Sequence, residues 1–120
     1  MNKVAVVAQA RFLSEGLQVD TARMRANLEA THGMIMGEAV MMRLAPILGR
    51  GEAHHKVNDA CDAVRAEGIT LAAALSRIPA IAARLDPAAV EAMTDPSSYL
   101  GSAHAFTDRV VARARAVVTL

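Results

Sequence analysis

Residues Gly33–Pro46, GMIMGEAVMMRLAP, form a helix-length run in which apolar residues cover most of the helical circumference. Glu38 and Arg43 interrupt the run, so it is too short and too charged to cross a bilayer. A helix that is apolar on nearly every side belongs at the centre of a core. We therefore predict a central Met-rich helix wrapped by the other segments. We prefer this interpretation to a partner-binding groove, which Met-rich helices also form.

The size and composition favour one helical domain. The chain has 120 residues, of which 53% are apolar and only 2% aromatic, and its net charge is +1. So few aromatic residues argue against base-stacking nucleic-acid modules and against β-sandwiches. The balanced charge gives no electrostatic reason to bind nucleic acid or an anionic membrane. One cysteine excludes an internal disulfide, and the apolar run after Lys3 is too short for a signal peptide, so we predict a cytoplasmic protein.

Capping signals and helical periodicity divide the rest of the chain into helices. Asp20, Thr70 and Asp86 are good N-caps, the last followed by Pro87 at the first helical position. No strand-like alternation appears, so we predict an all-α fold, a small helical domain of about six or seven helices. The expected helices of the domain span residues 21–31, 33–48, 52–67, 71–77, 80–85, 87–94 and 102–118, and a further helix over residues 4–15 precedes them.

The histidines offer no complete metal site. His54 and His55 are adjacent, so on a helix they point about 100° apart and do not chelate one ion together. His55 with Asp59, and His104 with Asp108, have the i, i+4 spacing of two ligands. A zinc site needs three or four ligands, so we expect solvated helix faces and no bound metal.

Four further residues are candidates for chemistry. His32 lies at a helix break, where a terminus-capping role is favoured over that of a base. Cys61 falls on the apolar stripe of its helix, which favours a core residue over a nucleophile. Glu38 is expected to have little access to solvent, as an acid or base or, more simply, in an ion pair between helices. Arg43 shares that expectation; it is five residues away, so the two do not face each other.

Basic residues gather on the last helix. Arg109 and Arg113 form an i, i+4 pair that suits a carboxylate, and Arg115 follows them. The simpler interpretation is a solvated face near a helix C-terminus, where the helix dipole favours cations. A glycine-rich phosphate loop, a nucleophile elbow and a dinucleotide fingerprint are all absent from the sequence. We therefore predict no catalytic, cofactor-binding or metal-binding residues in this chain.

The order of segments resembles the C-terminal domain of the fumarase/aspartase superfamily, and within it adenylosuccinate lyases and 3-carboxy-cis,cis-muconate cycloisomerases. The resemblance runs from about Arg11 to Ala114. It rests on these motifs: GLxVDxxRMxxNLxxTxGxIxxExVM from Gly16 to Met41, Leu44-Ala45-Pro46, GRxEAH from Gly49 to His54, Glu67-Gly68, DPSSYLGSA from Asp95 to Ala103, and Asp108-Arg109-Val110. The last two, with Leu44-Ala45-Pro46, are most similar to the cycloisomerases.

The resemblance implies a role within a larger enzyme. Such cycloisomerases close 3-carboxymuconate into 4-carboxymuconolactone in protocatechuate degradation, without a cofactor. They are homotetramers with a shared helical bundle, and their active sites take a serine from a Gly-Ser-Ser loop and a histidine from the central domain. This sequence has no such loop, and no residue here matches the catalytic serine or base. Residues 1–16 would be the end of a bundle helix, and residues 17–120 the C-terminal helical domain.

Two classes of function follow. The first is the C-terminal domain or a truncated form of the cycloisomerase, inactive alone, or the same domain of another superfamily lyase such as adenylosuccinate lyase. The second is a stand-alone helical interaction module. The expected partners are the catalytic domains of the same enzyme, or a second copy through residues 4–15, whose Val4, Val7 and Phe12 would be exposed without a bundle. No nucleic acid or membrane partner is expected.

Overall fold

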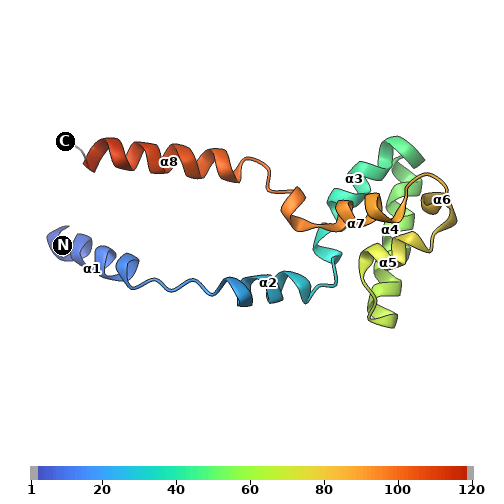
Figure 1. The fold of residues 1–120 in the computed structure, drawn as a ribbon, viewed down its shortest axis with the longest axis horizontal. Coiled ribbons are helices and arrows are strands. Elements are labelled where there is room, and N and C mark those ends of the chain that lie inside the picture. Colours follow the sequence, from blue (N-terminus) through green and yellow to red (C-terminus); the bar gives the residue numbers. More distant parts are fainter. Residues whose placement is uncertain (1–2, 119–120) are drawn as a thin grey trace.

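The computed structural model describes residues 3–118, and these form helices joined by turns (Figure 1). No strand occurs between residues 3 and 118, which confirms the all-α prediction. Positions 1, 2, 119 and 120 lie outside the described residues. The α-helices are α1 (Lys3–Glu15), α2 (Thr21–Glu29), α3 (Gly37–Leu48), α4 (Arg50–Glu67), α5 (Leu71–Ser76), α6 (Pro79–Ala82), α7 (Pro87–Thr94) and α8 (Ala103–Val118), with 3-10 turns η1 (Met34–Met36) and η2 (Pro96–Ser98). Residues 17–118 hold seven of them, in line with the expected six or seven.

The predicted N-caps are confirmed. Asp20 Oδ1 accepts a hydrogen bond from the Arg23 amide at 2.8 Å, and Asp86 Oδ1 accepts one from the Ala89 amide at 2.7 Å. Thr70 Oγ1 does the same for α5. These bonds satisfy amide groups that have no partner within the helix, which explains why the helices begin where the sequence signals place them.

Helices α3 to α7 form one compact unit. The most extensive contacts join α3 to α4, followed by α4 to α5 and α5 to α7. Its core consists mainly of alanine, valine and leucine side chains. The buried residues are Met36, Ala39, Val40, Leu44, Ala53, Val57, Ala60, Val64, Leu71, Ala72, Ala74, Leu75, Ile81 and Val90.

The structure does not confirm a central Met-rich helix. The predicted helix is divided into η1 and α3, and α3 supplies no more buried residues than α4 or α5. Ile35 and Met42 on its outer face are 56% and 58% exposed. The core is therefore shared mainly among α3, α4 and α5. One face of α3 stays open because the chain segments before and after the compact unit run away from it.

Those two outer segments form arms. The N-terminal arm is residues 3–30, with α1 and α2 joined by the extended residues 17–20, and the C-terminal arm is α8. Both leave the compact unit on the same side, so the molecule measures 62 × 28 × 27 Å (Figure 1). Neither α1, α2 nor α8 contributes a buried residue. The division at residue 16 remains a prediction, although α1 does stand apart from α2.

Candidate functional site

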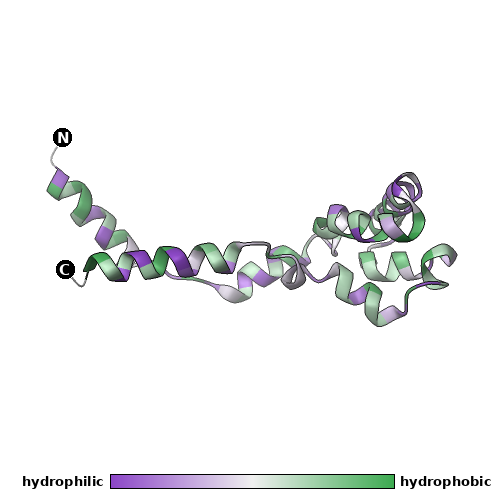
Figure 2. Ribbon diagram, turned by 90° about the horizontal axis from the view of Figure 1, so that it is seen from above, coloured by the Kyte–Doolittle hydropathy of each residue, from purple (hydrophilic) through white to green (hydrophobic). Residues whose placement is uncertain are grey.

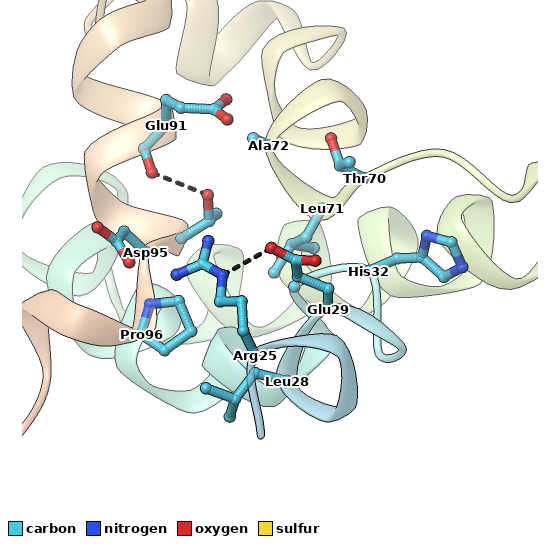
Figure 3. A pocket seen from close by; sticks show the side chains of 12 residues that line it. Arg25, Leu28, Glu29, His32, Thr70, Leu71, Ala72, Glu91, Asp95 and Pro96 are labelled. Atoms are coloured by element: carbon cyan, nitrogen blue, oxygen red, sulfur yellow. Dashed lines mark hydrogen bonds and ion pairs between the residues drawn. The ribbon is translucent and has the colours of Figure 1, made fainter. Parts of the chain in front are cut away.

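A cleft of about 640 Å³ lies where the N-terminal arm meets the compact unit (Figure 3). Helix α2 forms one wall, and the start of α5 with the end of α7 forms the other. Its polar rim carries one guanidinium and three carboxylates, besides an imidazole and two hydroxyls. The lining residues are Arg25, Leu28, Glu29, His32, Gly33, Thr70, Leu71, Ala72, Glu91, Thr94, Asp95 and Pro96.

Arg25 is the cation that faces the three carboxylates of the cleft. Its Nε donates to Glu29 Oε1 at 2.6 Å within α2, and its side chain extends toward Asp95 and Pro96 on the other wall (Figure 3). The hydrogen bond and the charge of Glu29 raise the pKa of Arg25, and Asp95 adds to this effect. Arg25 is therefore ion-paired within its own helix and interacts with Asp95 on the opposite wall only through its charge.

Asp95 is held by the turn that follows it. Its Oδ2 accepts a hydrogen bond from the Ser97 hydroxyl at 2.6 Å, and its Oδ1 accepts one from the Ser97 amide at 2.9 Å. These two bonds lower the pKa of Asp95, and the charge of Arg25 lowers it further. The carboxylate therefore remains ionised over the whole physiological range of pH.

The base of the C-terminal arm is attached to α3 through the same turn. Arg43 Nη2 donates to the Ser98 carbonyl at 3.4 Å and lies 3.3 Å from the Ser98 hydroxyl. Arg43 is half-buried on α3. The Ser98 carbonyl supplies a hydrogen-bond acceptor for its guanidinium, in place of the ion pair between helices that was expected. Glu38, expected to lack solvent, is exposed instead, because no arm covers its face of α3. It is therefore not a buried acid or base.

The histidine pairs do not form a metal site. His54 and His55 are exposed, their rings meeting edge to face with centroids 5.9 Å apart, and the Asn58 amide nitrogen lies 3.4 Å from His54 Nδ1. Asp59, His104 and Asp108 are also exposed. Within residues 3–118 no group of three or more metal-binding side chains comes together.

The remaining candidates have structural explanations. His32 is exposed at the break after α2 and adopts a left-handed backbone with φ of 50°, and its carbonyl accepts a hydrogen bond from the Leu71 amide, so it forms part of the turn. Cys61 is partly buried against the core, and burial raises the pKa of its thiol, which makes it a poor nucleophile. Arg109 lies 5.6 Å from the centre of the Phe106 ring on α8. Arg113 and Arg115 are exposed on that helix.

Both arms present large apolar side chains to solvent, and Figure 2 shows apolar residues along each of them. On α1 these include Val4, Val7 and Phe12, all more than two thirds exposed. On α8 Phe106, Val110 and Val117 recur at helical spacing, and each is more than half exposed. Exposed apolar faces of this kind mark contact surfaces.

A second, apolar hollow of about 340 Å³ lies on the open face of α3 and α4, lined by Met41, Met42, Ala45, Arg50 and His54.

The arrangement is suited to docking. Among the described residues no helix is long and apolar enough to span a membrane. Sequence reasoning missed the cleft. The i, i+4 spacing of Arg25 and Glu29 was visible, but nothing in the sequence indicated that Asp95, seventy positions from Arg25, would face the same cleft.

Comparison with known proteins places this architecture. The family model described as "Adenylosuccinate lyase C-terminus" matches residues 33–110, so it includes the compact unit and the first half of α8. A 3-carboxy-cis,cis-muconate cycloisomerase of Bradyrhizobium diazoefficiens is 41% identical over 82% of this chain and 22% of its own length. A nitrosuccinate lyase of Streptomyces davaonensis is 40% identical over 82% of this chain and 21% of its own.

A solved structure shares the layout. A fumarate lyase from Mesorhizobium sp. BNC1 is 43% identical, with a TM-score of 0.82 over 89% of this chain and 25% of that one. The aligned region covers 89% of this chain, which is much more than the compact unit between the two arms. Part of the arms therefore aligns as well. The chain thus spans only about a fifth to a quarter of the length of its relatives.

Proposed function

Since the chain belongs to the adenylosuccinate lyase C-terminal family, we propose that it serves as the C-terminal domain of a 3-carboxy-cis,cis-muconate cycloisomerase. The observation that carries the proposal is the 41% identity to such an enzyme over most of the chain. In that role the domain contributes to lactonisation of 3-carboxymuconate, in which a substrate carboxylate adds across a double bond without a cofactor. The reaction belongs to aromatic-compound degradation, by the β-ketoadipate pathway, in the cytoplasm.

The exposed arms support a docking role. Helix α1, with its apolar side chains in solvent, is proposed as the end of a helix that continues a bundle formed by the rest of the enzyme. Helix α8 leaves the compact unit on the same side, so one partner surface can contact both arms. The same α1 face allows self-association, and we propose a homo-oligomer on this ground. An isolated chain would retain the docking surfaces but not the reacting groups, since stabilisation of a transition state needs preorganised side chains.

A domain exchange tests the proposal. The segment of the Bradyrhizobium diazoefficiens cycloisomerase that aligns with this chain is replaced by the corresponding residues of this chain. Loss of 3-carboxymuconate absorbance and formation of the lactone are then followed. We expect the hybrid to lactonise the substrate at a rate within about tenfold of the parent. A folded hybrid without turnover would contradict the assignment. This chain alone should give no turnover, and ordinary enzyme rates from the pure chain would refute that part.

A different lyase activity is the second candidate. The nitrosuccinate lyase matches the same share of the chain with nearly the same identity. Exchange of the same segment into that lyase distinguishes the two, because the matching host should retain activity and the other should lose it. A stand-alone interaction module is the third possibility. It predicts a stable complex of the pure chain, with itself or with a partner, in the absence of any lyase.

A further inference from the structure

Helix α2 is attached to the compact unit at one end only. None of its residues is buried, and the chain turns at His32 and Gly33, both with positive φ, of 50° and 86°. The Leu71 amide donates to the His32 carbonyl at 2.8 Å and fixes the turn to the start of α5. The rest of α2 stands off from α7 across the cleft. The turn at His32 and Gly33 is therefore the point about which α2 can rotate toward α7 or away from it.

The charges on α2 and on the opposite wall of the cleft favour a movement of α2 toward α7. Arg25 on α2 faces Glu91 and Asp95 from the region of α7, but it makes its ion pair with Glu29 on its own helix. The Glu29 and Arg25 side chains are each 61% exposed, so this pair is weak and screened by water. Asp95 keeps its charge through the Ser97 bonds and interacts with Arg25 without a direct ion pair. One arginine therefore has two competing sets of carboxylate partners.

Closure would also bury apolar surface. Leu28 lines the cleft and is 37% exposed, whereas Leu71 and Ala72 on the opposite wall are already buried, so only Leu28 has apolar surface left to cover. Moving α2 toward α7 would bring Leu28 onto this wall. The gain from burial and the exchange of one exposed ion pair for another are both small, so the two positions are close in free energy.

We propose that Arg25 is a two-position latch: paired with Glu29 it leaves the cleft open, and paired with Asp95 it closes α2 against α7. The latch sets the direction of the N-terminal arm relative to the compact unit. Arg25 is a positioning residue in this sense and touches no reacting group. The latch is a property of the chain itself; only its use, to adjust the arm as the domain docks, rests on the proposed function.

The test measures the distance between the two walls. Spin labels are placed at Asn27 and Ala92, which are exposed and do not line the cleft, in a Cys61→Ala background. Electron–electron double resonance then gives the distribution of distances in the chain without any substrate. Arg25→Gln and Glu29→Gln both remove the same ion pair within α2, so they form a matched pair of variants. Arg23→Gln on the opposite face of α2 is the control.

The latch predicts opposite shifts. Glu29→Gln frees Arg25 for Asp95 and should shorten the mean distance, whereas Arg25→Gln leaves three carboxylates around the cleft and should lengthen it. Asp95→Asn, which can still accept from the Ser97 amide, should abolish the shortening caused by Glu29→Gln. Arg23→Gln should change nothing. If Glu29→Gln and Arg25→Gln move the distance in the same direction, loss of helix stability explains the change and the latch is wrong. If neither moves the distance, the latch is also wrong. These outcomes are independent of turnover by any hybrid enzyme.

Discussion

The Leu71 amide donates a 2.8 Å hydrogen bond to the His32 carbonyl, and this bond joins the base of the N-terminal arm to the compact unit. The neighbouring Gly33 has φ of 86°, and a Cβ at that position would lie 3.3 Å from Leu71 Cβ. The turn therefore needs a residue without a side chain, for backbone conformation and for space.

We expect Gly33→Ala to lower the free energy of unfolding by about 1–3 kcal/mol, because a side chain there combines left-handed strain with crowding. Gly51→Ala is the control. Gly51 lies in α4, where an added Cβ would meet nothing within 4 Å, so alanine should be neutral or stabilise by up to about 1 kcal/mol. Urea unfolding of both variants measures the difference. Equal effects at the two positions would contradict the role given to the turn.

The shared core predicts which apolar residues matter. Leu75 on α5 is 1% exposed, and Leu75→Ala should cost about 2–5 kcal/mol through the cavity it leaves. Met42 lies in the apolar run that the sequence placed at the centre, yet it is 58% exposed, so Met42→Ala should change stability by less than about 0.5 kcal/mol. Thermal unfolding distinguishes the two. A large loss of stability for Met42→Ala would instead support a central, buried position for this helix.

The exposed face of α1 predicts self-association. Phe12 is 69% exposed on a helix that buries nothing, and a glutamate there would place a charge in any contact between copies. Phe12→Glu should shift the chain to a later elution volume in size-exclusion chromatography. Arg11→Glu, one position away, tests whether charge alone has this effect. An unchanged elution volume for Phe12→Glu would exclude this contact.

The turn after α7 predicts a depressed pKa for Asp95. The Ser97 hydroxyl and amide both donate to its carboxylate and hold its pKa below the ordinary value of 3.8. Because the folded pKa is the lower one, the contribution of this turn is present above about pH 4 and is lost as the pH falls through the folded pKa. Carbon-detected NMR titration measures the value. Ser97→Ala should raise it, and Ser102→Ala, beyond the turn, should not.

The setting of Cys61 predicts low thiol reactivity. Burial raises its pKa, the charge of Asp62 adds to the effect, and Arg65 opposes it. The folded chain should therefore react with a disulfide reagent at pH 8 at least about tenfold more slowly than the same chain in denaturant. Reaction at equal rates would show that the thiol is neither buried nor electrostatically disfavoured.

Local signals in the sequence determined the helices themselves. Asp20, Thr70 and Asp86 marked helix starts correctly because an N-cap acts on amides two or three residues away. The family was also identified from sequence, through motifs between Gly16 and Val110, and the match of residues 33–110 confirms it. The first turn of the Gly33–Pro46 run became a 3-10 turn, a detail that its apolar pattern does not encode.

Only the tertiary structure decided which apolar faces meet. The Gly33–Pro46 run is apolar nearly all round, so its composition does not indicate which side packs; the contacts with α4 and α7 bury Ala39, Val40 and Leu44 and leave Met42 in solvent. The packing also decides the two charged residues of this run. Glu38 is exposed, whereas Arg43 donates to the Ser98 carbonyl. Periodicity reports a residue's neighbours along its own helix, whereas burial depends on segments far away in the chain, and that information resides in the packing alone.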